Sequence, residues 1–337
     1  MRMTGRRWLA AFLIFAAGTL SGCKRTEAPA DPISRSAFLL NTFVTVTRYD
    51  SQDEAVLEGS LDLCRQYEEL LSTTIDTSEV SRINHRSPDE TAVTVSQETA
   101  ELIRKGLEYG ERTEGAFDIT IQPVSSLWDF TSGQAKLPDP ELLKEAAQKV
   151  DYRNVHVEGS QVILDSPDTA IDLGAIAKGY IADRIKDYLL ENGVNSATIN
   201  LGGNVLCVGS RPDGTPFKIG LQMPFADRNE TIAALNIDGL SVVTSGVYER
   251  HFELDGVNYH HLLNPEDGYP YQNGLLSVTI VSPLSVDGDA LSTSCFSLGL
   301  EKGMELAESM DGVYAYFITD DYEIHYSEGA RELISES

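Results

Sequence analysis

The chain has 337 residues, of which 42% are hydrophobic and 23% are charged, a composition typical of a globular protein with one large core or two smaller ones. Its 52 acidic residues outnumber its 26 Lys and Arg residues, so the formal net charge is −26. This balance excludes sequence-independent nucleic-acid binding, which needs clustered cations to neutralise phosphates. An anionic ligand would need a local cation or a ring of backbone N–H groups.

The first residues resemble an export signal rather than part of the fold. Three arginines within the first seven residues precede an apolar run at 8–17, which is too short to span a bilayer but fits a signal-peptide core. The following "LSGC" resembles a bacterial lipobox, which predicts a lipoprotein signal peptide over 1–22 and lipidation of Cys23. The alternative is a plain secretory signal with a chance cysteine. Polar residues 23–35 predict a tether, so we expect a lipid-anchored protein on the extracytoplasmic side of the membrane, at the periplasmic or cell-surface face.

Periodicity predicts the elements of the first half of the chain. Alternating β-branched residues predict a strand over 38–50. Apolar residues at helical spacing predict three helices, which cover residues 53–73, 96–115 and 139–150. Residues 154–165 predict two short strands joined by a turn.

The second half alternates between strands and helices. Residues 170–194 predict a strand that ends near Asp172, followed by a helix that begins near Gly174 and ends at Gly193. Residues 287–310 predict a helix with a break near Leu300. Paired or single strands are predicted over 196–209, 250–263, 275–283 and 312–329.

This order of elements predicts an α+β fold with mixed or largely antiparallel sheets and interspersed helices over residues 36–330. The region forms either one domain or two α/β subdomains with the active site between them. The glycine-rich fingerprints of doubly wound nucleotide folds and of P-loops are absent from the sequence. The widely spaced Cys64, Cys207 and Cys295 lie in apolar surroundings, which predicts buried thiols rather than a disulfide framework or zinc site.

The segment "DGDALST" at 287–293 raises the possibility of a metal site. Asp289 and Thr293 are one helical turn apart and would share a face, where a carboxylate and a hydroxyl can bind one hard cation such as Mg²⁺. A third oxygen would come from elsewhere, and the turn "DLGAIAKG" at 172–179 offers a backbone carbonyl before a helix N-terminus. The alternatives are a helix N-cap with a threonine bonded to its own helix, and an ordinary strand-to-helix junction with Lys178 in solvent.

Two further segments contain candidate site residues. His260 and His261 are neighbours on a predicted strand and therefore face opposite ways, so one can enter a cleft while the other is structural. A histidine is a plausible general base near neutral pH, although a lone histidine is more often structural. Phe117 resembles a core residue, and Asp118 beside it would need a ligand or a backbone N–H as partner.

Six segments in this order and spacing resemble one family. They are "GAFDITIQPVSSLW", "IDLGAIAKGYIADRI", "INLGGNV", "TSGVYER", "YHHLLNPEDGYP" and "DALST". Together they resemble the FAD:protein FMN transferases, the ApbE-like flavin transferases, over residues 38–317. The resemblance implies an ApbE-like (T-fold-like) architecture, and several members of the family are lipoproteins.

The resemblance also implies an activity and its partners. The enzyme would split the pyrophosphate of FAD and attach FMN through a phosphoester to a Thr, or sometimes Ser, hydroxyl of an acceptor protein, releasing AMP. One or two Mg²⁺ ions would assist. The acceptor would be a flavinylated subunit of a membrane redox complex, and no nucleic acid would be bound.

Site residues follow from the matching motif positions. The resemblance implies metal binding by the Ala175 carbonyl, the Asp289 carboxylate and the Thr293 hydroxyl, with Asp289 and His261 as catalytic residues. His261 would take the proton from the acceptor hydroxyl. The implied FAD contacts are Leu40, Thr74, Ala116, Phe117, Asp118, Asp172, Lys178 and His261.

The chain departs from the family pattern at two positions. Leu40-Asn41-Thr42 stands where the family often has Met-Gly-Thr, and an aromatic residue sometimes found near Thr74 is absent. Three other functions stay open from the sequence: a Mg²⁺-dependent FAD pyrophosphatase that forms FMN and AMP, a non-catalytic flavin-binding lipoprotein, and an adhesive surface lipoprotein.

Overall fold

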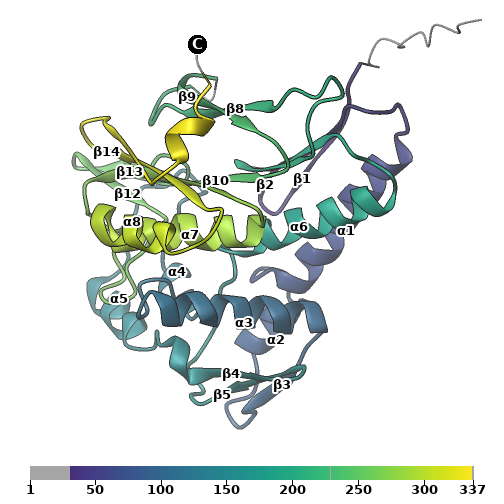
Figure 1. The fold of residues 1–337 in the computed structure, drawn as a ribbon. Helices are drawn as coiled ribbons and strands as arrows, with labels where there is room; N and C mark the ends of the chain where they lie inside the picture. Colours follow the sequence, from purple (N-terminus) through teal and green to yellow (C-terminus); the bar gives the residue numbers. More distant parts are fainter. Residues whose placement is uncertain (1–30, 228, 336–337) are drawn as a thin grey trace, which may run out of the picture.

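The computed structural model describes residues 31–227 and 229–335 (Figure 1). The predicted signal peptide, Cys23 and most of the predicted tether lie outside the described residues. Within the described part of the chain, no helix is both long and apolar enough to cross a membrane.

The fold is built on one eight-stranded sheet, in which every neighbouring pair of strands is antiparallel. This confirms the predicted α+β class with largely antiparallel sheets. In spatial order, the strands are β1 (Ile33–Leu39), β2 (Thr42–Arg48), β6 (Ala197–Leu201), β7 (Asn204–Val208), β10 (Ser241–Gly246), β13 (Leu275–Ser282), β14 (Tyr314–Thr319) and β15 (Ile324–Tyr326).

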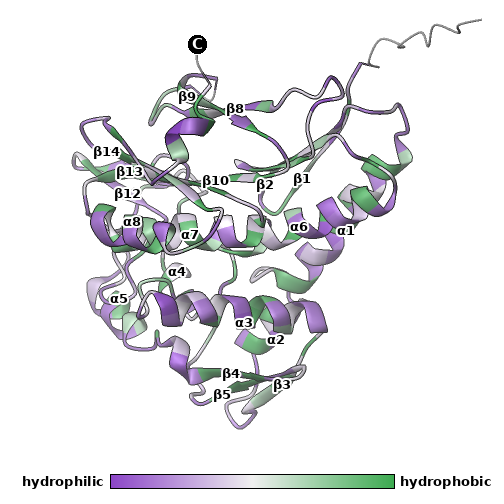
Figure 2. Cartoon of the chain, viewed as in Figure 1, coloured by the Kyte–Doolittle hydropathy of each residue, from purple (hydrophilic) through white to green (hydrophobic). Residues whose placement is uncertain are grey.

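Helices cover one face of this sheet and a hairpin lies on the other (Figure 1). The helices are α1 (Ala55–Leu71), α6 (Ala177–Glu191), α7 (Ser285–Leu298) and α8 (Leu300–Glu308). The hairpin consists of β8 (Phe217–Gln222) and β9 (Thr231–Ile237). Figure 2 shows hydrophobic and hydrophilic residues on different parts of α1, as its predicted apolar spacing requires. The α7 helix is buried on most sides because it packs on β10 and β13 of the sheet, beside α6 and α8 in the same layer and against α3 of the second layer.

Residues 72–170 form a second layer on the far side of these helices (Figure 1). This layer contains α2 (Glu79–Asn84), α3 (Gln97–Arg112), α4 (Gln122–Ser125), α5 (Pro140–Ala147) and the short 3₁₀ helix η1 (Tyr152–Asn154). Its small sheet has the order β3 (Ala92–Thr94), β5 (Gln161–Leu164) and β4 (Val155–Glu158). The remaining elements are the hairpin of β11 (His251–Leu254) with β12 (Val257–His260), and η2 (Ala330–Leu333) near the C-terminal end.

Four predictions near the N-terminus and around α6 were wrong. The strand expected over 38–50 is the β1–β2 hairpin, whose turn residues Leu40 and Asn41 both have φ of 53°. The β1 strand begins at Ile33, inside the predicted tether. Residues before Asp172 form no strand, and α6 begins at Ala177 rather than near Gly174. The cause is local, because the Asp172 side chain bonds the Gly174 backbone and holds this segment as a loop.

Other predictions were confirmed. The helical segment near the C-terminus is interrupted at Gly299, where φ is 80° and α8 begins one residue later. Cys64, Cys207 and Cys295 are free, buried thiols, and burial raises the pKa of each thiol to about 12. A thiol with such a pKa stays protonated at neutral pH, so these cysteines are packing residues.

Candidate active site

A cavity of about 1530 Å³ lies where one end of the large sheet meets α6, α7 and the second layer. Every site residue that the sequence predicted within the described chain lines this cavity. They are Leu40, Thr74, Ala116, Phe117, Asp118, Asp172, Ala175, Lys178, His261, Asp289 and Thr293. Residues separated by up to about three quarters of the chain, from Leu40 to Thr293, are therefore brought to one site by the fold.

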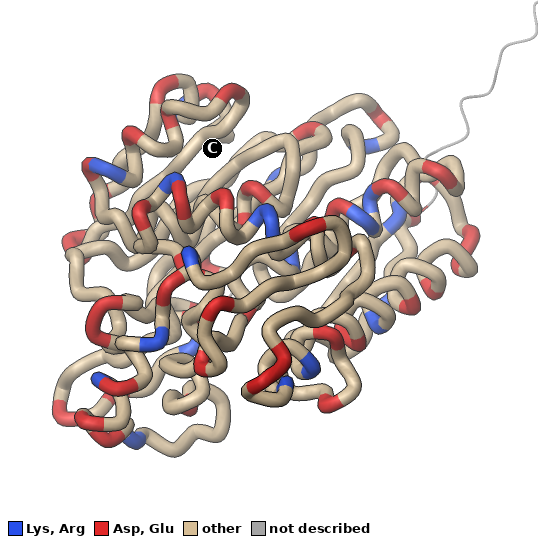
Figure 3. The backbone as a smooth tube through the Cα atoms, turned by 90° about the horizontal axis from the view of Figure 1, so that it is seen from below, with Lys and Arg blue, Asp and Glu red and all other residues tan. Residues whose placement is uncertain are grey.

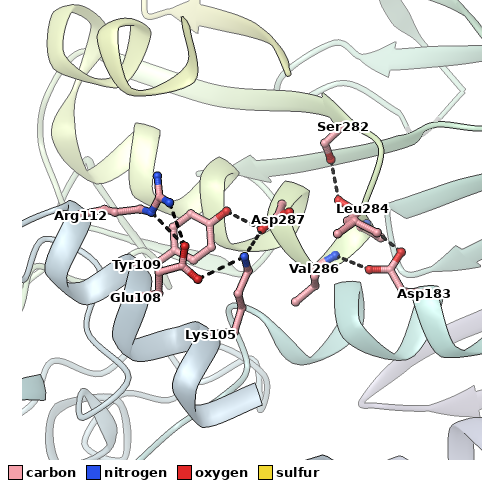
Figure 4. A network of polar contacts seen from close by, with 10 residues as sticks. Lys105, Glu108, Tyr109, Arg112, Asp183, Ser282, Leu284, Val286 and Asp287 are labelled. Atoms are coloured by element: carbon pink, nitrogen blue, oxygen red, sulfur yellow. Dashed lines mark hydrogen bonds and ion pairs between the residues drawn. The ribbon is translucent and has the colours of Figure 1, made fainter. Parts of the chain in front are cut away.

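Close packing of α6 against the start of α7 forms the floor of the site. A Cβ on Gly179 would lie only 2.2 Å from the Ser285 carbonyl oxygen, so this contact requires glycine. The Gly179 N–H donates to Asp289 Oδ2 at 2.8 Å. On the next turn of α6, Asp183 accepts from the N–H groups at the start of α7 (Figure 4). The turn that contains Ala175 is thus held against the helix that contains Asp289.

Asp289 is a buried carboxylate, with 5% of its surface exposed. Burial raises its pKa, while the Lys178 ammonium and the Gly179 N–H act in the opposite direction. A buried carboxylate is costly unless it is paired. It lies inside α7, whose N-cap is Leu284, so the predicted alternative that these acids cap the helix is wrong.

The Thr293 hydroxyl lies one helical turn after Asp289 and faces β10. Its Oγ1 is 3.2 Å from Ser245 Oγ, which is itself 2.8 Å from Ser292 Oγ. Ser292 donates to the Asp289 carbonyl oxygen at 2.9 Å. The hydrogen bond found for Thr293 thus goes to a neighbouring strand, which contradicts the alternative that it bonds back to its own helix.

Asp287 has a different role from Asp289. Its Oδ1 accepts a 2.7 Å hydrogen bond from the Tyr109 hydroxyl and lies 2.8 Å from Lys105 Nζ (Figure 4). Both partners are on α3, and Glu108 of the same helix is also within ion-pair distance of Lys105. The first acid of "DGDALST" therefore ties α7 to the second layer, and only the second acid, Asp289, faces the cavity.

The two adjacent histidines separate as the alternation predicted. His260 is buried, and its ring contacts the Tyr271 carbonyl oxygen through Nε2 and the Leu262 N–H through Nδ1. His261 lines the cavity, where its Nδ1 lies 3.3 Å from the Arg250 carbonyl oxygen. Burial, followed by the charges of Arg250 and nearby groups, lowers the pKa of His261 to about 3. The imidazole is therefore neutral at physiological pH, and with Nδ1–H donating to the Arg250 carbonyl oxygen, Nε2 is the nitrogen that can accept a proton.

Two of the predicted FAD contacts are carboxylates already engaged by the protein. Asp118 accepts hydrogen bonds from the backbone N–H groups of Thr120 and Tyr152, at 2.7 and 2.8 Å. Asp172 accepts from the Gly174 N–H at 2.8 Å and from the Ser125 hydroxyl at 3.1 Å. Both acids line the cavity, but these bonds show that they also order the loops that form its wall.

Leu40, Thr74 and Phe117 line other parts of the cavity. The Leu40 N–H donates to Glu68 Oε1 at 2.7 Å, which holds the β1–β2 turn in its left-handed conformation. Asn41 tolerates this conformation better than most residues, which is consistent with glycine at the matching family position. Phe117 packs on Tyr109 with ring centroids 6.0 Å apart, whereas Thr74 is exposed.

Sequence reasoning missed two residues of the site. Arg250 ends the quoted segment "TSGVYER", lines the cavity and places an exposed cation next to His261. Asn204 follows the two glycines of "INLGGNV" and is buried, with its Oδ1 accepting from Ser285 Oγ at 2.8 Å. Its amide nitrogen lies toward Asp289 without completing a hydrogen bond. The signal was present, because both residues belong to motifs that carried the resemblance.

The donor set around Asp289 fits Mg²⁺. The carboxylate, the Thr293 hydroxyl and the Ala175 carbonyl on the same cavity are hard oxygen ligands, and Mg²⁺ usually keeps several waters besides. A cation would also provide the pairing that the buried carboxylate requires. Within the described residues there is no group of three or more His, Cys, Asp or Glu side chains that could hold a metal.

Comparisons with known proteins agree with this geometry. The model of the ApbE family matches residues 40–317. The chain is 39% identical over 300 residues to a FAD:protein FMN transferase of Klebsiella pneumoniae, covering 88% of this chain and 92% of the relative. It is 34% identical over 316 residues to a FAD:protein FMN transferase of Treponema pallidum, covering 88% and 87% of the two chains.

Solved structures show the same fold. The ApbE protein of Thermotoga maritima superposes with a TM-score of 0.82 at 31% identity, covering 90% of this chain and 100% of that chain. The flavin transferase ApbE of Vibrio cholerae gives a TM-score of 0.81 at 26% identity, with the same coverage. The cavity, its converging motifs and these matches together show that the chain belongs to the ApbE family.

Proposed function

We propose that this protein transfers the FMN part of FAD to a Thr or Ser hydroxyl of an acceptor protein in a Mg²⁺-dependent reaction. The observation that carries the proposal is the convergence of Asp289, Thr293, Ala175 and His261 on one cavity. Membership of a family whose relatives are named FAD:protein FMN transferases supports the same reaction.

The reaction requires a deprotonated hydroxyl in line with a phosphorus atom. The acceptor oxygen attacks the phosphorus on the FMN side of the pyrophosphate, the bond to the bridging oxygen breaks, and AMP leaves with that oxygen. The neutral His261 ring takes the proton of the hydroxyl through Nε2, which lacks a proton because Nδ1–H donates to the Arg250 carbonyl oxygen. Held by Asp289, Thr293 and the Ala175 carbonyl, Mg²⁺ would neutralise charge on the phosphates.

A protein with a net charge of −26 repels an anionic substrate, so binding requires cations close to the site. Figure 3 shows acidic positions spread over the chain, with fewer basic ones between them. Lys178 and Arg250 both line the cavity and both act electrostatically on His261. We assign them to the phosphates of FAD, because a dinucleotide approaching this acidic protein needs positive charge at the point of binding.

We further propose that the protein is a lipoprotein anchored through Cys23 on the extracytoplasmic side of the membrane. The support is the "LSGC" segment after a basic and apolar start. The acceptor would then be a subunit of a membrane redox complex facing the same compartment. Replacing Cys23 by Ser should move the protein from the membrane fraction to the soluble extracytoplasmic fraction, and an unchanged membrane association would contradict the anchor.

The transfer reaction is tested by intact-mass measurement. The purified protein is mixed with FAD, Mg²⁺ and an acceptor protein that carries a known flavinylation site. We expect the acceptor to gain the mass of one FMN less one water, and AMP to appear in equal amount. Release of FMN and AMP at the same rate without acceptor would favour the pyrophosphatase. Tight FAD binding with no product would favour a passive flavin-binding protein.

A further inference from the structure

The cavity continues onto the face of the large sheet opposite α6 and α7, where none of the predicted catalytic or metal-binding side chains lies. We propose that this part of the cavity, which we call the acceptor groove, binds the acceptor protein as an extended segment that leads to His261. Its defining residues are Phe38, Phe43, Thr45, Asn200, Val205 and Ile219. The inference rests on the proposed function, because only a transferase needs to bind an acceptor.

Strand register places the floor of the groove on one face of the sheet. Phe43 pairs with Phe38 of β1, and two residues further along β2, Thr45 pairs with Asn200 of β6. Asn200 in turn pairs with Val205 of β7. Residues two apart on a strand, and residues paired across strands, point to the same side. The intervening Val44 points to the other side and is fully buried there.

One wall of the groove is the β8–β9 hairpin. Figure 1 shows this hairpin on the face of the sheet away from α6 and α7. Its Phe217 and Leu221 pack against Cys207 and Val242 of the sheet in a separate hydrophobic cluster. Ile219 of the same strand lines the cavity. The hairpin therefore covers the middle of the sheet and leaves the Phe38 and Phe43 side of this face open.

The outer lip of the groove is an exposed aromatic pair. Phe38 and Phe43 keep 62% and 67% of their surfaces exposed, and their rings form an edge-to-face contact with centroids 5.5 Å apart. Both rings line the cavity. Exposed apolar surface beside a cavity marks a binding surface, because it gains free energy only when a partner covers it.

The size of the cavity leaves room for a second occupant. Small-molecule sites usually enclose about 300–1,000 Å³, and this cavity measures about 1530 Å³. The FAD contacts implied by the motifs lie at the strand ends, on the helix side of the sheet or in the second layer. None of them is on the groove floor. The acceptor hydroxyl must reach the same phosphorus atom, so the segment that carries it needs a path into this cavity.

A glycine turn connects the groove to the reaction site. Gly202 and Gly203 join β6 to β7 and line the cavity between the two parts. A Cβ on Gly202 would lie 2.2 Å from Thr42 Oγ1, so no side chain can stand at this crossing. An extended segment can pass over this turn and present a short side chain, such as that of Thr or Ser, to His261.

The groove also defines the chemistry of the segment that it binds. Thr45 and Asn200 on the floor supply polar groups to which the backbone of an extended chain can hydrogen-bond, while Val205 and Ile219 offer small apolar contacts. The phenyl rings at the lip suit one apolar side chain of the acceptor, several residues from the modified hydroxyl. We therefore expect an unstructured or strand-like acceptor segment rather than a folded surface.

Removing the aromatic lip tests the inference. The double variant Phe38→Ala/Phe43→Ala is compared with the wild-type protein by following FMN transfer at varied acceptor concentration, with FAD binding measured separately. We expect the KM for acceptor to rise about tenfold or more, as for the loss of a central aromatic contact. The kcat at saturating acceptor and the Kd for FAD should stay within about twofold. Both residues are largely exposed, so the fold should be retained.

A matched control is Tyr326→Ala. This tyrosine is on β15, at the opposite edge of the same sheet, and is 37% exposed outside the cavity. The KM of the Tyr326→Ala variant for the acceptor should equal the wild-type value. An unchanged KM in the double variant, or a Kd for FAD that rises in parallel, would overturn the acceptor groove alone. Failure of the wild-type protein to modify any acceptor would instead overturn the proposed function, and the groove with it.

Discussion

The α6–α7 junction and the β1–β2 hairpin line the same cavity but are built differently. At the junction, a glycine contact and buried hydrogen bonds hold Asp289 in place, and there is no room for a side chain at Gly179. At the hairpin, Phe38 and Phe43 are exposed, and Leu40 has a backbone conformation that depends on one bond to Glu68. The residues proposed to react, at the α6–α7 junction, are therefore fixed by close packing. The residues proposed to recognise ligands, at the β1–β2 hairpin, stay exposed to solvent.

The largest effect is expected at the junction, for Asp289→Asn. This change keeps the shape of the side chain but removes the charge that the donor set offers to Mg²⁺. We expect FMN transfer to fall by about 10²–10³-fold or more, measured by intact mass with saturating FAD and Mg²⁺. The fold should persist, because burial already disfavours the charged form of this carboxyl group. Turnover near the wild-type rate would remove the metal site from the account.

The next largest effect is expected for His261→Ala. Loss of a general base typically costs about 10²–10⁴-fold, and we expect the lower end because the low pKa of His261 makes it a weak base. The Kd for FAD should change far less than the transfer rate. His251→Ala is the control, since this histidine is exposed on β11 and does not line the cavity. A variant that loses only FAD affinity would show that His261 is a contact and not the base.

Asp287→Asn should show that the two acids of α7, Asp287 and Asp289, have different roles. The change weakens the bonds to Tyr109 and Lys105 and leaves the cavity residues in place. We expect the free energy of unfolding in urea to fall by about 1–3 kcal/mol, while FMN transfer stays within about tenfold of wild type. If Asp287→Asn abolishes transfer as completely as Asp289→Asn, the division of roles between the two acids is wrong.

A smaller effect is expected at the exposed part of the cavity for Thr74→Tyr. Thr74 lines the cavity and is exposed, so the ring of a tyrosine fits there without disturbing the core. A new stacking contact with FAD should add about 0.5–1.5 kcal/mol, or roughly a two- to tenfold lower Kd. Calorimetric titration measures the change, and Thr77→Tyr, on the same loop but outside the cavity, is the control. Weaker binding in Thr74→Tyr would show that no ring of FAD lies at this position.

The last prediction is that the His261 ring does not change its protonation state between pH 8 and pH 5. The pKa of His261 is lowered to about 3 from an ordinary value near 6.5, so its ring stays neutral from pH 8 down to pH 5. NMR signals of the His261 ring should therefore not move over this range in the substrate-free protein. A midpoint near pH 6.5 would contradict the lowered pKa, and transfer would then weaken in mild acid as the base becomes protonated.

Much of the fold followed from local patterns. The helices α1, α3 and α6 have apolar residues at helical spacing, and the opposite orientation of His260 and His261 follows from strand geometry alone. The site residues were predicted from motif order, and the fold places those within the described chain on one cavity.

The features that the sequence did not reveal depend on partners far away in the sequence. The Leu40 turn requires a bond to Glu68, 28 residues later, and no local signal announces a leucine with positive φ. Asp287 finds its partner Tyr109 across 178 residues, so its role was not separable from that of Asp289. For Asp118 the sequence left a ligand or a backbone N–H open as partner, and the structure shows the N–H of Tyr152, 34 residues away, bound to it.

The most direct test is a crystal structure of the protein with FAD and Mn²⁺, an ion with oxygen ligands like those of Mg²⁺ and a strong anomalous signal. Our account predicts one anomalous peak bonded to the Asp289 carboxylate, the Thr293 hydroxyl and the Ala175 carbonyl, next to the phosphates of FAD. A peak elsewhere in the cavity, or FAD bound with these three oxygens bonded only to protein, would contradict it.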